Sequence, residues 1–594
     1  MPSNFVRFLT FFLLATALIV PYAVTAHTYP IPTFYSEFVA LALWLFVGAA
    51  VILLVRESPS TSGFATPAVA LVPFLFGLLL VVQAVAMPVA APSMAWLGAG
   101  FLLAAFMATH IGYGIVRAGQ KERAMVWVAT ALVLGGLFAV FCQLIQLFHL
   151  ETKVAPFVVT YNIKIDRRPF GNLAQANHLA TYISFAMAAA LYLVQSGRLR
   201  VLLWAVLSAI YSGGLALTVS RGPWLQMAVI IVAGFWIALA GTRRDGARGQ
   251  GGLRNWLLPI VLFVIFVIVN AYVRWANVRY NLQLDQSAAE RFKEAGQIAP
   301  RLALWHYGLT MFRGHPLLGV GWGDFPMHQF ELVRALGGVE IANNSHDILI
   351  DLLAKTGIVG LAIVLVGLLA WFVRALRVPH TPERVFGFML IGVLLMHALV
   401  EYPQQYMYFL LPAMFVFGLL ETRPLRIVPS RVSLGVFTVI VVGGIASLYP
   451  ILRDYNRAEV LYYGQQPAKE YAAAPSFLFR AWGDYGMATL LPMNAVHLDT
   501  KLAAHRRAIA LLPGETVLRR YAVLQALSGD TAAALDTAER LRIFATELND
   551  WPAQLAALYS LTDQQPTLKD FKAELVKRYG ANAKPGTDDD ESDD

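Results

Sequence analysis

Side chains that can do chemistry are concentrated in one segment, residues 274–356. It contains Arg301 and His306, then the glycine-rich run 315–323, and finally Asn343-Asn-Ser-His-Asp347. Imidazole can accept a proton near neutral pH, and guanidinium binds phosphate through a planar fork. Connectors between membrane helices are usually short, so a connector this long with such residues predicts an active site.

Within this segment, His346 is the strongest candidate for a catalytic base. Asn344 or Ser345 can cap a helix that Gly357 would end, with His346 in the first turn. The helix would pack inward through its apolar residues Ile348, Leu349, Leu352 and Leu353. Free amides and the positive helix end favour neutral imidazole there, which is the state that a general base needs. The alternative is a structural histidine.

A second polar group, Gln175, Asn177 and His178, stands where an apolar run begins. Amide and imidazole groups at a membrane interface can bind sugar hydroxyls or phosphate oxygens. The alternative is helix capping by Asn172 or Asn177, which would explain one amide but neither Gln175 nor His178.

A third candidate, Arg221, lies in a short connector between two apolar runs. Arginine can clamp phosphate oxygens, and Pro223 can start the next helix. The alternative is an arginine that reaches toward lipid headgroups. We favour phosphate binding because the other tight connectors on this side carry no positive charge.

The elements that must position these residues are membrane helices, because 58% of the 594 residues are hydrophobic and only 14% are charged. Runs near the ~20 residues that cross a bilayer core predict thirteen spans. The first also resembles a signal peptide, and we interpret it as an uncleaved helix. The runs are 5–26, 34–55, 67–88, 94–116, 125–147, 179–195, 201–219, 223–241, 256–273, 357–376, 385–400, 407–421 and 433–449.

Basic residues predict the orientation of the spans. One set of alternate connectors carries arginines such as Arg56, Arg117 and Arg374, which predicts the cytoplasmic face. The candidate residues then lie on the other face, and an odd number of spans puts the C-terminal region there too. The net charge of +9 is mostly this orientation signal and implies no nucleic-acid partner.

The predicted organisation has five parts: spans one to nine in 1–273, the catalytic loop 274–356, spans ten to thirteen in 357–449, a helical region 450–585 and an acidic disordered tail 586–594. In the helical region, Asn494–Leu512, Glu515–Ser528 and Thr531–Glu547 indicate amphipathic helices, stacked in pairs like tetratricopeptide repeats. The region is either a packed cap or a concave surface for an acceptor protein.

Cysteine and metal chemistry have no support in the sequence. The lone Cys142 lies inside the fifth predicted span and is interpreted as a packing residue. No spaced Cys and His ligands or EF-hand carboxylates occur, so we expect neither a metal nor a cofactor.

Several motifs together resemble the bacterial PglL-type protein O-oligosaccharyltransferases, within the O-antigen ligase and polymerase superfamily. In the first motif the family commonly has Gln-Pro-Asn-His, and Ala176 stands here in place of the proline. The resemblance is carried by Gly171–His178, Arg221, Arg301 with Trp305, His315–Trp322, Asn344–Asp347, Lys355–Gly357 and His397–Pro403.

The resemblance implies an all-α, GT-C-like enzyme of the bacterial inner membrane, with its active site on the periplasmic face. Such an enzyme moves a whole glycan from a polyprenyl (undecaprenyl) pyrophosphate to a Ser or Thr hydroxyl of a pilin-like or other periplasmic protein. His346 would accept the hydroxyl proton, and Arg221 and Arg301 would hold the departing pyrophosphate. The residues that would position donor or acceptor are Gln175, Asn177, His178, Asn344 and Tyr402.

Two other functions remain open. An O-antigen ligase or polymerase would share the donor site and use lipid A core or another repeat unit as the acceptor; the long C-terminal extension and the 171–178 motif favour a protein acceptor. A lipid-linked glycan transporter would be expected to carry ionisable groups at mid-membrane depth. The predicted spans hold little of that kind beyond His110 and His397.

Overall fold

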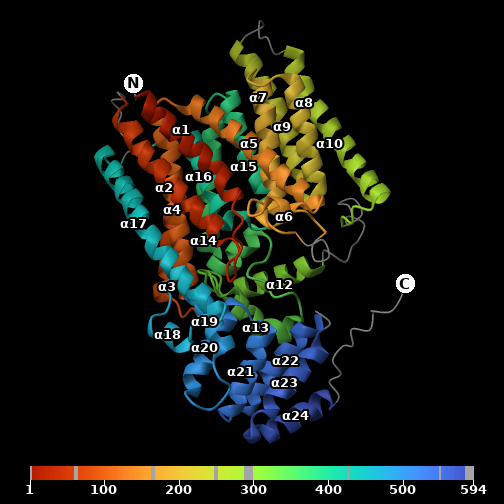
Figure 1. Ribbon diagram of the computed structural model, residues 1–594. Coiled ribbons are helices and arrows are strands. Elements are labelled where there is room, and N and C mark those ends of the chain that lie inside the picture. The colour runs from red at the N-terminus through yellow and green to blue at the C-terminus, as the bar shows by residue number, and fades with distance from the viewer. Residues whose placement is uncertain are drawn as a thin grey trace. The chain divides into compact units, whose positions relative to one another are not determined.

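The structure is a computed structural model that describes residues 3–58, 64–161, 167–245, 252–285, 299–425, 427–547 and 550–581. In this part of the chain the fold is all-α, as predicted (Figure 1). The one extended feature among these residues is an isolated bridge between Pro67 and Pro424. The predicted acidic tail 586–594 lies outside the described residues.

Ten helices among the described residues are long and apolar enough to cross a membrane, against the thirteen predicted. Three predicted spans correspond to shorter helices, which have 17, 17 and 14 residues: α8 (Val201–Leu217), α15 (Pro382–Ala398) and α16 (Met407–Leu420). They are shorter than the ~20 residues that a simple span needs. The ten are α1 with η1 (Asn4–Tyr22), α2 (Phe34–Arg56), η2 with α3 (Ala68–Ala86), α4 (Pro92–Arg117), α5 (Lys121–Leu147), α7 (Ala176–Gln195), α9 (Gly222–Asp245), α10 (Gly252–Tyr280), α14 (Ile348–Leu376) and α17 (Ser430–Tyr462).

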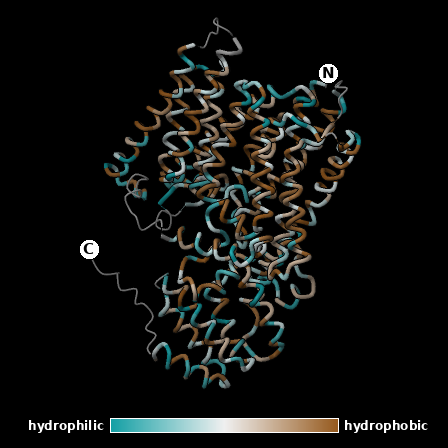
Figure 2. Tube along the Cα trace, turned by 180° about the vertical axis from the view of Figure 1, so that it is seen from behind, coloured by the Kyte–Doolittle hydropathy of each residue, from teal (hydrophilic) through white to brown (hydrophobic). Residues whose placement is uncertain are grey.

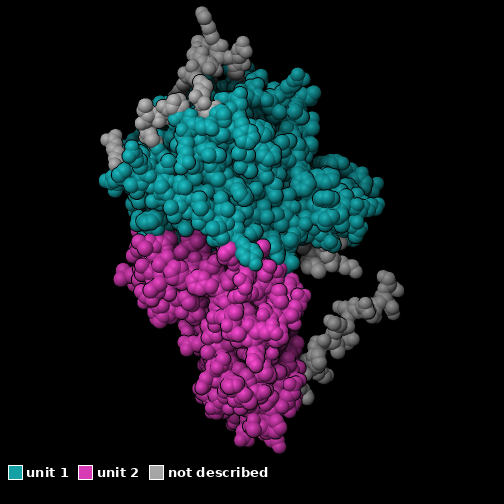
Figure 3. Space-filling model, turned by 60° about the vertical axis from the view of Figure 1, so that its left-hand side comes forward, with its two compact units in different colours: residues 1–75, 101–295, 363–449 teal, residues 76–100, 296–362, 450–594 magenta. Residues whose placement is uncertain are grey.

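The chain divides into two compact units, drawn in Figure 3. Unit 1 comprises residues 1–75, 101–295 and 363–449. Its most buried helix is α7, where 94% of the central stretch is inside the protein. Small residues permit this burial: a Cβ on Gly136 of α5 would lie 2.3 Å from the Cβ of Ala186 on α7. Small residues at helix contacts let the backbones approach closely, as membrane helices require.

Unit 2 comprises residues 76–100, 296–362 and 450–594, so it combines part of the predicted loop with the C-terminal region. The loop contributes α12 (Ala299–Gly314) and α13 (Phe325–Leu336). The three amphipathic helices predicted at the C-terminus are confirmed as α20 (Leu498–Leu511), α21 (Glu515–Leu527) and α22 (Thr531–Glu547). Figure 2 shows mixed polar and apolar colouring along these helices and longer apolar stretches in the membrane helices. The other helices are α18 (Ala468–Ala473), α19 (Arg480–Leu490), α23 (Trp551–Asp563) and α24 (Lys569–Tyr579).

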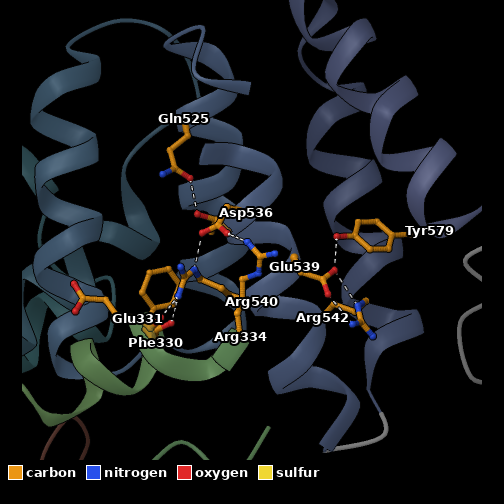
Figure 4. Close-up of polar contacts among 10 residues, drawn as sticks. Phe330, Glu331, Arg334, Gln525, Asp536, Glu539, Arg540, Arg542 and Tyr579 are labelled. Carbon is orange, nitrogen blue, oxygen red and sulfur yellow. Dashed lines mark hydrogen bonds and ion pairs between the residues drawn. The ribbon is translucent and has the colours of Figure 1, made fainter. Parts of the chain in front are cut away.

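Polar contacts join α13 to α22 inside unit 2 (Figure 4). Arg540 donates hydrogen bonds of 2.5 and 2.6 Å to the carbonyls of Phe330 and Glu331, and its guanidinium lies 5.0 Å from the Phe330 ring centre. Asp536 pairs with both Arg540 and Arg334. Burial raises the pKa of the Asp536 carboxyl, but its bonds to these arginines outweigh burial and the pKa is lowered. The loop helix and a C-terminal helix are therefore connected by hydrogen bonds as well as by packing.

Candidate active site

Helix α14 is interrupted at Gly357, where φ is 62° and ψ is −164°. The glycine is required at this position because a Cβ would lie 2.3 Å from the carbonyl oxygen of Leu317. Segment 315–321 lies at the interruption and forms four backbone hydrogen bonds of 2.9–3.3 Å with α14. The amides of Val320 and Gly321 donate to the carbonyls of Ala354 and Lys355, and the amides of Ile358 and Val359 donate to the carbonyls of Pro316 and Leu317. We call this arrangement the α14 lock. Gly357 breaks the helix as predicted, and the apolar run predicted at 357–376 follows it as the second part of α14.

Two buried side chains secure the residues around the lock. The amide of Gln83 donates to the carbonyls of Leu318 and Lys355 at 2.7 and 2.8 Å, and its oxygen accepts from the amide of Trp322. The carboxylate of Asp324 accepts from two successive backbone amides, those of residues 90 and 91. Burial raises the pKa of Asp324, although these two hydrogen bonds act in the opposite direction. The glycine-rich motif 315–323 thus has a structural role.

His346 lies two residues before the first helical residue of α14, with φ at 57°. The expected position in the first turn is wrong, because Asp347 caps the helix in place of Asn344 or Ser345. The carboxylate of Asp347 accepts from the amides of Leu349 and Ile350 at 2.9 and 3.0 Å. Asn344 is buried, and its side chain accepts from the His346 amide at 3.2 Å.

The inward face of α14 also differs from the prediction. Leu352 is 7% exposed, as expected for a core position, whereas Leu349 is 39% exposed. In the first turn of α14, Ile348 is only half-buried and Leu349 is exposed, so the packed face of the helix begins one turn later, at Asp351 and Leu352. An exposed leucine close to His346 makes that surface partly apolar.

Arg301 lies on the helix that packs beside the His346 segment. A Cβ on Gly308 of α12 would lie 2.7 Å from Ile350 and 3.6 Å from Ser345, so α12 approaches the start of α14 closely. Arg301 is seven residues before Gly308, which puts it on the same side of the helix and about 10 Å along its axis. Its side chain is exposed. Unit 2 therefore holds Arg301, Asn344 and His346 on neighbouring elements.

Unit 1 holds a second polar group, which we call the Asn177 cluster: Arg168, Asn177, Ser220 and Glu401. Arg168 donates to Asn177 and Ser220 at 2.8 and 2.7 Å, and Ser220 donates to Asn177 at 2.8 Å. The amide of Asn177 donates to Glu401 at 3.3 Å. These bonds join the start of α7 to the α8–α9 and α15–α16 connectors, which carry Arg221 and Tyr402.

His178 belongs to the buried interior of unit 1. It is 2% exposed, and its Nδ1 lies 3.0 Å from the Tyr408 hydroxyl. One turn along α7, Thr181 lies 2.8 Å from Nδ1 of His397 and accepts from Gln226 at 2.8 Å. Such hydrogen-bonded polar groups hold α7, α9 and α15 in a single arrangement.

The remaining candidates stand beside the Asn177 cluster. Gln175 occupies the N-cap position of α7 without a side-chain capping bond, so neither Asn177 nor Asn172 caps this helix. Asn172 instead binds the backbone of residues 23, 157 and 159. Arg221 is half-buried, directly before α9, which begins with Pro223 in its first turn as expected. Tyr402 stacks on Tyr406 at a ring-centre distance of 6.1 Å.

A pocket in unit 1 opens beside Ser220, between the ends of α8, α9 and α10. Polar and aromatic groups line it, among them Trp224, Asn270, Arg274 and Asn277. None of these four residues was predicted from the sequence. They stand in or near apolar runs, and the periodicity of a span does not tell which of its residues border a pocket.

The structure thus places Gln175, Asn177, His178, Arg221 and Tyr402 in unit 1, and Arg301, Asn344 and His346 in unit 2. The roles of Arg168, Glu401 and the buried pair Asp351 and Lys355 were missed. The four-residue spacing of Asp351 and Lys355, typical of a helical ion pair, was a usable signal.

Three segments of the chain match known protein families. Residues 169–194 match a family described as protein glycosylation ligase, residues 205–365 match O-antigen ligase, and residues 385–557 match the C-terminal part of the virulence factor membrane-bound polymerase. The second match includes Arg221, Arg301, Asn344 and His346, and the first includes Gln175, Asn177 and His178.

Two curated proteins of Acinetobacter baylyi are similar in sequence. A general O-oligosaccharyltransferase is 25% identical over 460 residues, which cover 76% of this chain and 77% of that protein. A ComP-specific O-oligosaccharyltransferase is 23% identical over 265 residues, 44% of this chain and 45% of that protein. The predicted resemblance to PglL-type enzymes is confirmed by these similarities.

Proposed function

We propose that the chain is a protein O-oligosaccharyltransferase, because residues 205–365 match the O-antigen ligase family and residues 169–194 match a protein glycosylation ligase family. It takes a complete glycan from undecaprenyl pyrophosphate and transfers it to Ser or Thr hydroxyls of periplasmic proteins, at the periplasmic face of the inner membrane. The match of residues 169–194 to a protein glycosylation ligase family supports a protein acceptor, and the similarity to a general O-oligosaccharyltransferase along three quarters of the chain supports the transfer of an oligosaccharide.

In the proposed reaction, the acceptor hydroxyl oxygen forms a bond to the anomeric carbon of the first sugar. The bond between that carbon and the pyrophosphate oxygen breaks, and the polyprenyl pyrophosphate leaves with the electron pair. His346 accepts the hydroxyl proton as the new bond forms. A general base contributes ~10²–10⁴-fold, so donor binding and charge stabilisation must provide most of the rate enhancement.

Arg221 and Arg301 bind the pyrophosphate in this proposal. Charge on the leaving group grows in the transition state, where fixed positive groups help most. Gln175, Asn177, His178, Asn344 and Tyr402 position donor or acceptor, the buried ones by holding the backbone rather than by touching substrate.

The observation that carries the proposal is the geometry around His346. The residue is held at a positive φ beside the N-terminus of α14, and the helix that bears Arg301 packs against the same segment. Positive φ in a non-glycine residue costs energy and is often retained at functional sites. A histidine and an arginine on neighbouring elements suit proton transfer beside a phosphate leaving group.

The test is expression of the chain in a bacterium that lacks its own O-oligosaccharyltransferase and O-antigen ligase and makes one defined lipid-linked glycan. We expect glycan on periplasmic protein, detected by mass spectrometry of Ser and Thr peptides. Glycan on lipid A core would instead identify an O-antigen ligase, the second function that the O-antigen ligase match favours. Purified enzyme should keep its activity in a chelator, since we propose no metal.

A further inference from the structure

A buried ion pair on α14 lies close to residues 344–347, the segment that contains His346. Asp351 and Lys355 are one turn apart on α14, 3.0 Å separates Oδ2 from Nζ, and their side chains are 7% and 4% exposed. The other carboxylate oxygen of Asp351 accepts from the amide of Ser345 at 3.2 Å. One carboxylate therefore contacts both the ammonium group and the residue that precedes His346.

Lys355 connects this pair to the α14 lock. Its ammonium lies 5.3 Å from the ring centre of Trp322 and 5.9 Å from that of Phe325, and its carbonyl accepts from Gln83 and from Gly321. Moving two charges out of water costs free energy, so a buried ion pair adds little to the stability of a protein. We therefore expect the Asp351–Lys355 pair to act by fixing one arrangement of the chain.

The arrangement that needs fixing is the backbone of residues 344–347. Ser345 is fully buried, and its hydroxyl donates to the carbonyl of Asp347. The following residue, His346, has the unfavourable φ of 57°. Such a conformation persists only where surrounding contacts determine it.

We propose that Asp351, which pairs with Lys355, is a positioning residue whose carboxylate oxygen fixes the Ser345 amide and thereby keeps the His346 imidazole where it can accept the acceptor proton. This inference rests on the proposed function of His346. Asp351 itself contacts no reacting atom in it. A displacement of about 1 Å at a catalytic group can cost about 10²-fold in rate, so a single lost backbone contact is sufficient to impair transfer.

Two matched double variants of the full-length enzyme separate this role from a contribution to stability alone. Asp351→Asn with Lys355→Met removes both charges but keeps an oxygen that can accept from Ser345. Asp351→Leu with Lys355→Met also removes both charges but leaves no acceptor. Neither variant buries an unpaired charge, so both should fold.

We expect the Asn variant to keep kcat within about fivefold of the parent and the Leu variant to lose about 10²-fold in kcat, with KM for a Ser/Thr acceptor peptide little changed in either. Purified yield and thermal unfolding in detergent report folding. If the Leu variant does not fold, Asp351→Ala with Lys355→Met replaces it. A folded variant without the acceptor that retains the kcat of the Asn variant overturns the proposal, as does a folded Asn variant that loses activity.

His346→Asn is assayed in parallel so that the two hypotheses fail separately. Near-normal transfer by His346→Asn refutes the general-base role itself. An inactive His346→Asn together with equal kcat for the two double variants refutes the positioning role of Asp351 and leaves the general-base role intact.

Discussion

At the residue scale, three neighbouring side chains fix the backbone around His346. Asn344 accepts from its amide, Asp347 caps the helix that follows, and Asp351 holds the residue before it. The imidazole itself is half-buried, so acceptor and solvent can approach it. Substitutions of its side chain should therefore change chemistry more than stability.

His346→Asn should lower the transfer rate by about 10²-fold or more, because asparagine keeps a polar group of similar reach but cannot take a proton at neutral pH. Transfer to an acceptor peptide and donor binding are measured on the same preparation, and donor binding should be nearly unchanged. His306→Asn is the matched control, since His306 is an exposed histidine of the same segment. An equal loss of transfer rate in both variants would mean that the loss comes from a disturbed fold and not from the missing proton acceptor.

Arg221→Ala and Arg301→Ala should each weaken donor binding, because each removes a charge-assisted contact worth about 1.5–3 kcal/mol. Lysine should restore only part of the affinity, since it lacks the planar fork. Binding of a polyprenyl pyrophosphate analogue measures the effect. Arg313→Ala, an exposed arginine on the same helix as Arg301, should bind the analogue normally. Unchanged binding in both test variants would locate the donor site elsewhere.

At the element scale, α14 is assembled from two helical stretches joined across the lock. The backbone groups that the break leaves without helical partners bind segment 315–321. The lock positions the helix start, with Asp347 and Asp351, relative to α12. A substitution inside the lock should therefore affect the proposed active site without altering any of its residues.

Gly357→Ala should destabilise the protein by at least about 1–3 kcal/mol, because φ of 62° with ψ of −164° is a region used almost only by glycine. The Cβ would also clash with the Leu317 carbonyl at 2.3 Å. Thermal unfolding in detergent is the measurement. Gly314→Ala is the control, because a Cβ there meets no atom within 4 Å. Equal stability of the two variants would mean that the lock can relax.

The C-terminal helices contain a pH-sensitive position, His505 of α20. Burial lowers its pKa to about 4 from 6.5, although its hydrogen bond to the Lys501 carbonyl acts in the opposite direction. Below pH 6.5 the His505 side chain is protonated in the unfolded state, whereas in the folded state it stays neutral until the pH approaches 4. The free energy of unfolding is therefore at its full value above pH 6.5 and decreases as the pH drops toward 4, by roughly 3 kcal/mol in total.

Hydrogen exchange of α20 in the full-length enzyme, measured between pH 7 and 4.5 and corrected for the intrinsic rate, should report this loss. His505→Gln should remove most of the dependence, because glutamine does not titrate. His497→Gln, at an exposed position, should keep the parent behaviour. If the corrected exchange of the parent protein does not change with pH, protonation of His505 does not destabilise the folded state.

At the scale of the whole molecule, the loop and the C-terminal region share one hydrophobic core in unit 2. Met327, Phe330 and Val333 of α13 cluster with residues of α19 to α22 such as Leu541 and Phe544. The C-terminal region is therefore more than an appended acceptor-binding module. Its removal would expose the apolar side of α13.

Truncation after Asp454 should abolish transfer to a short Ser/Thr peptide as well as to a folded acceptor, because α13 loses its packing partners. Both acceptors are assayed with the same lipid-linked donor. A chain ending at Ala581, which keeps every described helix, should retain both activities. If the long truncation spares transfer to the peptide, the C-terminal helices serve recognition alone.

The amino-acid sequence was sufficient to predict the class of the protein and to select the candidate residues of its site. A bilayer demands long apolar helices, so the apolar runs predicted the ten membrane-length helices among the described residues, and amphipathic spacing predicted α20, α21 and α22. Motif resemblance selected the family and the segments around His346, Arg221 and His178. These signals are local in the chain, which is why they could be read without a structure.

The contacts of the candidate residues could be seen only in the tertiary structure. Packing between segments more than two hundred residues apart brought Gln83 to the lock, Glu401 to Asn177 and Arg540 to α13, and nothing in local sequence encodes such partners. It also made Asp347 the residue that caps α14, because several adjacent residues can cap a helix and only the surrounding contacts choose among them. Residue types can therefore be read from the sequence, whereas the geometry of the candidate site depends on contacts between distant segments.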